Sequence, residues 1–360
     1  LIAPASLAIV LDSFPSERRA LGVGLWGAAA AAAAAVGPSL GGALVELSGW
    51  RLVFLVNIPL GAAILWAGAR HLREREHLDS RLPDLAGAGL LAAALALLTL
   101  AIVEGDDWGW TGPSTLAAFG AAALLLAAVA VRGRRHPRPI VEPELFAGRA
   151  FRVGNLGTLL FSAAFFSIVL GNVLFLTSVW GYSVLTAGLA VLPGPVATTI
   201  VSGPAGRLAD RVGHRAVVLP GALLFAAGVL VLRSAGADPD YVGTWLPGTA
   251  LTGIGIGLAF PTLGAAAVRD VADDRYATAS AVNAAFRQIG AVLGTAILIA
   301  IVGDPASLAE TLAVADRAYL FAALAGALAG LVTLALGRPT ARPAPPATRE
   351  DPAAAEPAVA

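Results

Sequence analysis

The sequence has no cysteine, no methionine and no lysine, and only 13% of its 360 residues are charged. Without cysteine, neither a disulfide framework nor a thiolate metal site can form, and the four histidines have no paired spacing that suggests a metal centre. Soluble domains carry about 25% charged residues, so this chain has too few charges to cover a water-soluble globule. Hydrophobic residues make up 57% of it, and the mean hydropathy is +0.78. We therefore expect a membrane protein.

The N-terminal segment Leu1–Leu11 is apolar from its first residue and has no basic region ahead of it. This pattern is not typical of a signal peptide, which needs a positively charged start. Because the sequence begins with Leu1 instead of methionine, we expect a fragment in which Leu1–Leu11 is the end of a helix that starts earlier.

Apolar segments long enough to cross a bilayer follow one another along the chain. A helix needs roughly 20 apolar residues to span the hydrocarbon core, and these runs lack the two-residue alternation of barrel strands. The sequence therefore predicts an all-α, polytopic membrane protein with one partial span and ten full ones. The full spans are expected at Leu21–Val45, Leu52–Ala69, Leu85–Val103, Leu116–Val131, Phe151–Leu176, Val184–Ser202, Ala216–Leu232, Val242–Val268, Ala281–Val302 and Ala318–Leu336.

The distribution of arginine predicts the orientation. If the break at Asp12–Arg19 faces the cytoplasm and the spans alternate from there, 19 of the 24 arginines fall in cytoplasmic segments. Only Arg51, Arg233 and Arg317 fall outside. Cytoplasmic loops of membrane proteins carry an excess of basic residues, so this bias supports the topology. It also puts the Pro- and Ala-rich tail, residues 337–360, in the cytoplasm, where its composition predicts disorder.

A first motif lies within the predicted span Leu21–Val45. Gly37 and Gly41 are four residues apart, a spacing that lets another helix backbone approach closely. Pro38 removes a helical hydrogen bond and can kink the helix, and Gly42 follows directly. Taken alone, this pattern also fits a tight helix contact of the kind common in membrane proteins.

A second motif begins where the next span enters the membrane. Trp50 and Arg51 are residue types that suit the membrane interface, so simple interfacial anchoring explains them. Anchoring does not explain Asn57, Pro59 and Gly61 at fixed distances behind them.

A third motif, Gly206-Arg-Leu-Ala-Asp210-Arg211-Val-Gly213-His-Arg215, is expected in a short cytoplasmic turn between two spans. Gly213 permits a tight reversal of the chain, and Asp210 can pair with a neighbouring arginine. The alternative is an ordinary basic loop that obeys the charge bias described above.

Four polar residues inside predicted spans are candidates for a substrate path. Arg287, followed by Gln288, is the one charge well inside a late span, and intramembrane charge usually has a function. The alternative is that Arg287 reaches the cytoplasmic surface along the helix. Asn155 and Asn172 either line a cavity or form hydrogen bonds between helices.

Together these patterns resemble the 14-helix drug:proton antiporter branch of the major facilitator superfamily. The Gly37–Gly42 run is similar to the antiporter motif of that branch, and the Trp50–Gly61 run to the junction of its fifth and sixth helices. The Gly206–Arg215 run resembles the second copy of the superfamily's loop signature, and the Asn283–Gly294 run its penultimate helix.

The resemblance implies a division of the chain. Residues 1–69 would be the remnant of the N-terminal helix bundle, without its first three helices. Residues 70–149 would hold two extra central helices with cytoplasmic linkers, 150–336 the C-terminal six-helix bundle, and 337–360 the tail. A carboxylate in the first helix, thought to carry the proton in this family, would then lie outside this sequence.

The resemblance also implies the function. We expect a secondary transporter that exports small hydrophobic or cationic compounds, driven by a proton gradient and without a cofactor, catalytic residue or metal. Its expected surroundings are the lipid bilayer of the plasma (inner) membrane and a small-molecule substrate, with no nucleic acid, and we expect a monomer. The alternatives are a non-functional fragment of such a transporter and a membrane-embedded enzyme, for which a cluster of His, Asp or Glu at the membrane face is missing from the sequence.

Overall fold

The structure is a computed structural model that describes residues 9, 33, 37, 40–71, 84–136, 142–272 and 275–336. In these ranges the regular secondary structure is helical. The α-helices are α3 (Trp50–Leu55), α4 (Asn57–His71), α5 (Leu85–Val103), α6 (Gly105–Trp108), α7 (Pro113–Arg135), α8 (Arg149–Ser178), α9 (Val184–Ala190), α10 (Pro193–Val212), α11 (His214–Arg233), α12 (Leu246–Val268), α13 (Tyr276–Val302) and α14 (Leu308–Val332). Short 3₁₀ segments lie at Pro143–Ala147 and Thr333–Ala335, and a π-helical turn at Tyr241–Trp245 leads into α12.

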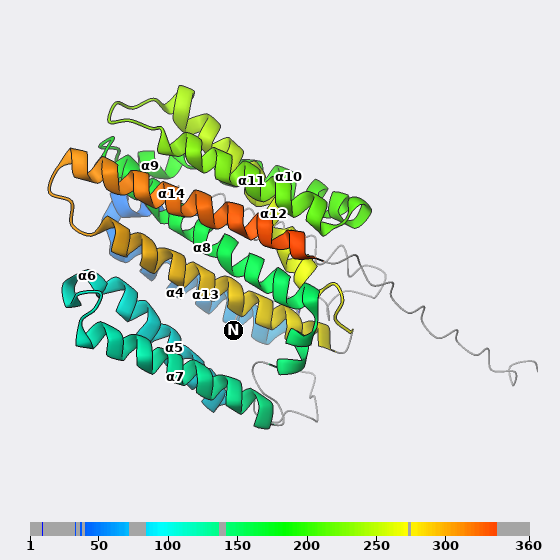
Figure 1. The fold of residues 1–360 in the computed structure, drawn as a ribbon. Helices are drawn as coiled ribbons and strands as arrows, with labels where there is room; N and C mark the ends of the chain where they lie inside the picture. Colours follow the sequence, from blue (N-terminus) through cyan, green and yellow to red (C-terminus); the bar gives the residue numbers. More distant parts are fainter. Residues whose placement is uncertain are drawn as a thin grey trace, which may run out of the picture.

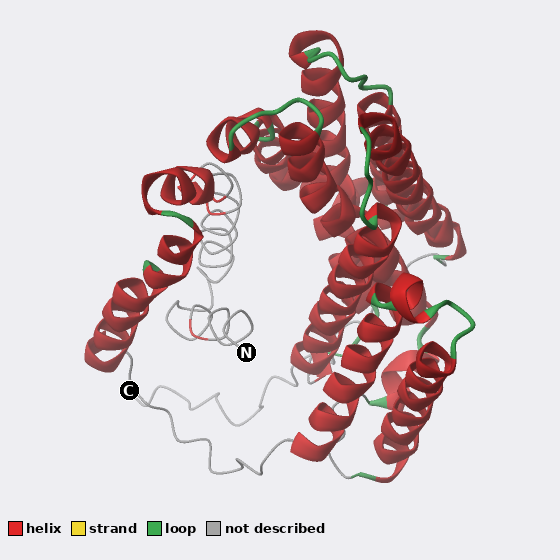
Figure 2. Cartoon of the chain, turned by 90° about the vertical axis from the view of Figure 1, so that its left-hand side faces the viewer, coloured by secondary structure: helices red, strands yellow, loops and turns green. Residues whose placement is uncertain are grey.

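The helices from α8 to α14 form one bundle around α8 (Figure 1). Helix α8 packs against α12, α13 and α14, while α11 packs between α12 and α14, and α10 packs on α12. Helices α5 and α7 form an antiparallel pair, and α5 packs this pair against α13. Helices α3 and α4 lie to one side of this bundle (Figure 2).

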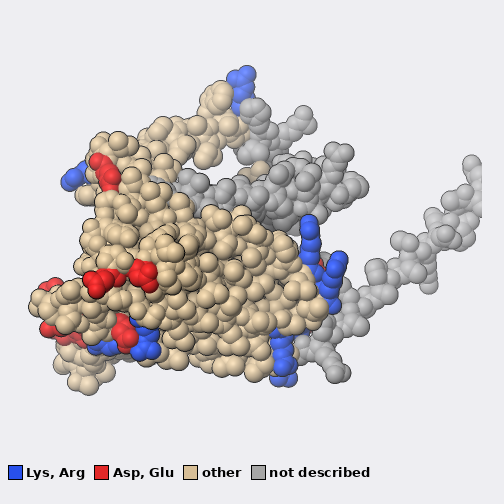
Figure 3. Space-filling model, turned by 90° about the horizontal axis from the view of Figure 1, so that it is seen from above, with Lys and Arg blue, Asp and Glu red and all other residues tan. Residues whose placement is uncertain are grey.

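The described surface is suited to lipid. Nine helical segments of the described chain are long and apolar enough to cross a membrane. Large apolar side chains point outward from them; Leu124, Ile200 and Leu324, for example, are each more than 60% exposed. Figure 3 shows charged side chains gathered at the two ends of the molecule with an uncharged belt between them. Apolar exposure on this scale is rare on soluble proteins, so the expected all-α membrane fold is confirmed.

The expected spans correspond to these helices, with longer ends. Leu85–Val103 has the same bounds in the structure as in the prediction, and α8 extends Phe151–Leu176 by two residues on each side. The predicted span Leu21–Val45 and the partial span Leu1–Leu11 lie mostly outside the described residues, and the tail 337–360 lies wholly outside them.

The predicted span Val184–Ser202 corresponds to one span, Val184–Val212, which differs from the prediction in its continuity and its end. It is two helices, α9 and α10, because Pro193 and Pro195 have no N–H with which to continue the hydrogen bonding of α9. Helix α10 then continues past Ser202 to Val212. The third motif therefore lies largely on a helix rather than in a turn, and the reversal occurs at Gly213, where φ is 89°.

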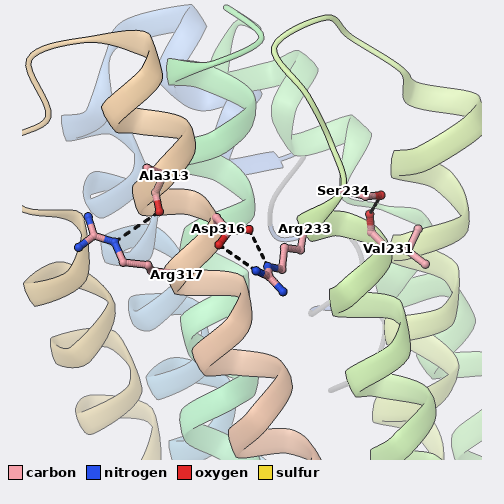
Figure 4. Close-up of polar contacts among 6 residues, drawn as sticks. All are labelled: Val231, Arg233, Ser234, Ala313, Asp316 and Arg317. Atoms are coloured by element: carbon pink, nitrogen blue, oxygen red, sulfur yellow. Dashed lines mark hydrogen bonds and ion pairs between the residues drawn. The ribbon is translucent and has the colours of Figure 1, made fainter.

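Ion pairs between helices join residues that the predicted topology puts on the same side. Asp84 at the start of α5 bonds Arg132 at the end of α7 over 2.7 Å, on the side expected to be cytoplasmic. On the opposite side, Arg233 of α11 forms a two-pronged pair with Asp316 of α14, at 2.6 and 3.0 Å (Figure 4). The same-side pairing supports the alternation of the spans.

The orientation itself is testable because the chain has no native thiol. Asp107 lies between α5 and α7, and Arg135 at the far end of α7; both are exposed. We expect a single cysteine at Asp107 to react with a membrane-impermeant maleimide in intact cells. A cysteine at Arg135 should react only after the cells are opened. Labelling of both from outside would contradict the predicted topology.

Candidate functional site

A buried polar junction lies where α8, α12 and α13 meet. The Asn283 side chain of α13 donates to Asn155 Oδ1 over 3.0 Å and to Thr158 Oγ1 over 3.1 Å, both on α8. The Asn155 amide in turn donates to the Phe151 carbonyl of its own helix at 2.8 Å. Asn155 and Thr158 are almost completely buried. A Cβ on Gly264 of α12 would lie 3.3 Å from Asn283 Oδ1, so all three helices share this point.

The second predicted asparagine makes a similar contact further along α8. Asn172 Oδ1 accepts a hydrogen bond of 3.0 Å from the Tyr319 hydroxyl of α14, and both residues are buried. Of the two alternatives for Asn155 and Asn172, the structure therefore has the hydrogen bond between helices in both cases. Hydrogen bonds between membrane helices are worth about 0.6–2 kcal/mol each, so these fix the register of α8 against its neighbours.

Two glycines bring α13 close to α8 beside this junction. A Cβ at Gly294 would lie 2.6 Å from the Cα of Ala163, and a Cβ at Gly290 would lie 2.8 Å from the Cβ of Ser162. Real side chains do not approach this closely. The Asn283–Gly294 run thus combines a polar anchor with a close helix contact.

Arg287 and Gln288 lie within this same run, and both are exposed. Arg287 is eleven residues from the start of α13 at Tyr276, about 16 Å along the helix at a rise of 1.5 Å per residue. In the part of the chain that the structure describes, no acidic side chain lies within 4 Å of it. The backbone of Arg287 thus lies near the middle of a span, one helical turn from Asn283.

The first motif makes its close contact at an unexpected glycine. No described atom lies within 4 Å of a Cβ at Gly37 or Gly41, whereas a Cβ at Gly42 would lie 2.9 Å from the backbone of Leu185. Four residues on, Glu46 Oε1 accepts a hydrogen bond of 3.1 Å from the Leu185 N–H. The expected approach at Gly37 and Gly41 is absent among these residues, and Pro38 lies outside the described chain.

The second motif has a local explanation. Helices α3 and α4 are separated at Val56, and the Asn57 amide donates to the carbonyls of Val53 and Phe54, at 2.9 and 3.3 Å. Asn57 thereby satisfies backbone acceptors exposed at the break. Pro59, in the first turn of α4, cannot donate a backbone hydrogen bond there. Gly61 lies in α4 with no described atom within 4 Å of its Cβ position.

At the start of α3, the Arg51 guanidinium lies 4.7 Å from the centre of the Trp50 ring. A cation over an aromatic face is a favourable arrangement. Both residues are exposed, which agrees with the interfacial position expected for them.

The third motif divides between two sides of α10. Ala205 and Ala209 are buried against Val217 of α11, while Gly206 and Asp210 are exposed. The expected pairing of Asp210 with an arginine is not found, since no ion pair of Asp210 within 4 Å occurs in the described chain. Arg211 occupies the last turn of α10 and Arg215 the first turn of α11.

The sequence did not identify two hydrogen-bond partners: Thr158, which accepts from Asn283, and Tyr319, which donates to Asn172. Thr158 follows Asn155 by three residues, so both lie on one face of a helix, and this spacing could have indicated a shared partner. Tyr319 stands near the start of the predicted span Ala318–Leu336, and nothing in its surroundings indicates Asn172, which is 147 positions away.

The ion pair between Asp84 at the start of α5 and Arg132 at the end of α7 changes the pKa of Asp84. Burial raises the pKa of Asp84, but hydrogen bonds from the Gly87 N–H and the Arg132 guanidinium, together with the charge of Arg132, outweigh it and hold the pKa below its ordinary value. Asp84 also caps α5, accepting from Gly87 N at 2.8 Å.

Asp84→Asn should slightly lower the apparent melting temperature at neutral pH. Asparagine caps a helix about as well as aspartate, so the change isolates the charge. A carboxylate with a depressed pKa stabilises the fold above its unfolded value of about 3.9, and this contribution disappears as the pH falls through the folded pKa. The difference between the two proteins should therefore vanish in acid. Asp107→Asn, at an exposed carboxylate outside this ion pair, is the control for the substitution itself.

The comparison with known proteins is consistent with this architecture. The family model described as the Major Facilitator Superfamily matches residues 1–191 and 154–359. The "Multidrug resistance protein Stp" of Mycobacterium tuberculosis is 32% identical over 300 residues, which are 82% of this chain and 55% of that protein. The "Methylenomycin A resistance protein" of Streptomyces coelicolor is 31% identical, covering 83% of this chain and 62% of that protein.

A third relative is the "Tetracenomycin C resistance and export protein" of Streptomyces glaucescens, 28% identical over 302 residues. These residues are 83% of this chain and 55% of that protein. The chain thus spans little more than half the length of the curated relatives it matches.

Proposed function

The chain belongs to the Major Facilitator Superfamily, and we propose that it acts, as part of a transporter, in the export of small hydrophobic or cationic compounds in exchange for protons. The superfamily is one of transporters, and the relatives named above are resistance and export proteins. Transporters of this kind bind substrate near the midplane between two groups of helices.

The observation that carries the proposal is the position of Arg287 and Gln288. Two exposed polar side chains stand midway along a span, and the Asn283 hydrogen bonds and the Gly290 and Gly294 contacts fix the helix that bears them. A polar group at this depth is costly in lipid. A pathway containing water on this side of α13 removes that cost and brings substrate to the same groups.

The proposed proton exchange needs a group that titrates within the membrane. In the described spans, Asp210 lies near the end of α10 and Glu310 in the first turn of α14. Asp316 lies eight residues into α14, but its carboxylate is paired with Arg233. The guanidinium of Arg287 does not deprotonate in proteins. We therefore assign proton carriage to a carboxylate outside the described spans, with the proton gradient as the only energy source.

We further propose that the chain lies in the plasma (inner) membrane as a multi-pass monomer with its C-terminal tail in the cytoplasm. The bias of 19 arginines toward one side supports this orientation.

The test is an export assay with the gene's complete reading frame in an efflux-deficient bacterial host. We expect the inhibitory concentration of at least one hydrophobic or cationic antibiotic to rise about fourfold or more, and an uncoupler that collapses the proton gradient to abolish the effect. Expression of residues 1–360 alone, beside the complete frame, separates an active chain from a non-functional fragment. Export that persists after the uncoupler would contradict the proton coupling, and no resistance to any compound would contradict the export function.

A further inference from the structure

A cavity of about 250 Å³ lies between α8, α13 and α14, apart from the Arg287 site. Helix α8 contributes Ser167, Gly171 and Phe175, which follow one another at four-residue steps along one face. Leu298 of α13 and Ala315 of α14 form the two sides. Figure 1 shows α13 and α14 on either side of α8.

The cavity lies further along α13 than Arg287, so it is separate from the proposed substrate path. Leu298 follows Arg287 by eleven residues, about 16 Å further along α13. Val302 and Pro305, at the loop between α13 and α14, also line the cavity. Its mouth is therefore at the end of the bundle that the topology puts outside the cell.

One hydroxyl in the cavity wall has no partner. Ser167 is 1% exposed, and its Oγ makes no hydrogen bond within the described chain. Of the other hydroxyls that line the cavity, Tyr319 donates to Asn172 Oδ1 and Thr311 Oγ1 donates to the Ser307 carbonyl at 2.9 Å. The third, Ser178, is exposed and makes no side-chain hydrogen bond within the described chain. A buried polar group without a partner costs about 1–3 kcal/mol, so a ligand that bonds to Ser167 would recover this loss.

Aromatic rings form the inner part of the wall. Phe175 lies 6.1 Å from Tyr319, edge to face, and stacks on the buried Trp245 with 5.6 Å between ring centres. Apart from Ser167, Ser178 and Thr311, the remaining lining is apolar. Small-molecule pockets are mostly apolar with a few placed polar groups, and range from about 300 to 1,000 Å³. This cavity has the same character at a slightly smaller size.

We propose that this cavity binds a small, uncharged, ring-shaped or branched apolar molecule with one hydroxyl, which forms a hydrogen bond with Ser167 Oγ. The absence of any charged residue from the lining excludes an ion as the ligand. The limited volume excludes a complete lipid. The proposal does not depend on the transport function, because it concerns binding alone.

The test uses 4-bromophenol and bromobenzene, which differ by one hydroxyl, with the purified chain in detergent at a mildly acidic pH. Bromine quenches tryptophan fluorescence, and Trp245 lies directly behind Phe175. We expect saturable quenching by both probes and about three- to tenfold tighter binding of 4-bromophenol, the value of one net hydrogen bond.

Ser167→Ala should remove the preference for 4-bromophenol and leave bromobenzene binding unchanged. Ser162→Ala is the matched control: its hydroxyl is on the same helix, fully buried and without a partner, but does not line the cavity. Ala315→Leu should weaken both probes at least tenfold by filling the space.

If Ala315→Leu does not fold, Gly171→Ala replaces it, since a Cβ there would lie 3.8 Å from Leu298 without a clash. Three results would overturn the proposal: no saturable quenching, unchanged binding after the cavity is filled, or a preference for the phenol that survives Ser167→Ala. The last result would mean that the phenol binds another group, such as the exposed Ser178 hydroxyl, which also lines the cavity.

Discussion

Replacement of Gly294 by alanine should destabilise the chain by about 1–3 kcal/mol, the usual cost of overpacking, although alanine is the better helix former. The new Cβ would lie 2.6 Å from the Cα of Ala163 on α8. Backbone atoms cannot move aside as a flexible side chain can, so α13 must shift away from α8. That shift also lengthens the Asn283–Asn155 hydrogen bond of 3.0 Å, which crosses the same interface. The gain in helix propensity, about 1 kcal/mol, offsets only part of the loss.

The same substitution elsewhere provides the control. Gly120 lies in α7, and no described atom lies within 4 Å of its Cβ position. Gly120→Ala should therefore raise the apparent melting temperature in detergent by a few degrees, while Gly294→Ala lowers it. A domain of 150–250 residues changes by about 2–4 °C per kcal/mol. Equal shifts for the two variants would contradict the close contact between α13 and α8.

The contrast between these glycines shows what sequence reasoning can and cannot resolve. The spacing of Gly37 and Gly41 predicts a close helix contact, yet the described chain makes that contact at Gly42. A glycine pattern identifies a helix that another backbone can approach. It does not identify the partner or the rotation of the helix about its axis, which depend on packing over the whole bundle.

Hydropathy located most spans but misjudged the helices at their ends. Hydropathy measures transfer into lipid, so it cannot detect the interruption between α9 and α10 before Pro193, because the residues on both sides of it are apolar. The predicted span also ends at Ser202, before Gly203 and Pro204, although α10 continues through both of them to Val212. Gly and Pro are the poorest helix formers, so local propensity does not predict this continuation. Gly213 was correctly predicted as the point of reversal.

The buried polar residues show a similar limit. Asn155 and Asn172 could be recognised as polar groups inside spans, but the choice between a cavity and a hydrogen bond depended on Asn283 and Tyr319. These partners are 128 and 147 positions away. Their depth in the membrane and their direction from the helix axis had to be known before the pairing could be seen.

Arg287→Ala should reduce export at least tenfold in the complete transporter while leaving the amount of folded protein unchanged. About 16 Å of helix separates Arg287 from the start of α13, which is half the thickness of a bilayer core of about 30 Å. The side chain is exposed, and no carboxylate in the described chain lies within 4 Å of it. A charge at this depth costs about 2.5–3.5 kcal/mol on insertion scales. Its removal should therefore not destabilise the fold, and a loss of export would be a direct effect on the path.

Because Arg287 is positively charged, the same variant can also be compared between cationic, neutral and anionic substrates. A guanidinium in the path attracts an anion and repels a cation, by about 4 kcal/mol at 4 Å when the effective dielectric constant is 20. If Arg287 faces the substrate directly, Arg287→Ala should impair export of neutral and anionic compounds and spare or improve that of cationic ones. If Arg287 instead pairs with a proton-carrying carboxylate, all substrates should lose export together. In both cases Arg287→Lys, which keeps the charge but not the planar fork, should retain more export of neutral and anionic compounds than alanine. Unchanged export of every compound by Arg287→Ala would mean that the side chain only reaches the cytoplasmic surface, and that the path lies along another helix.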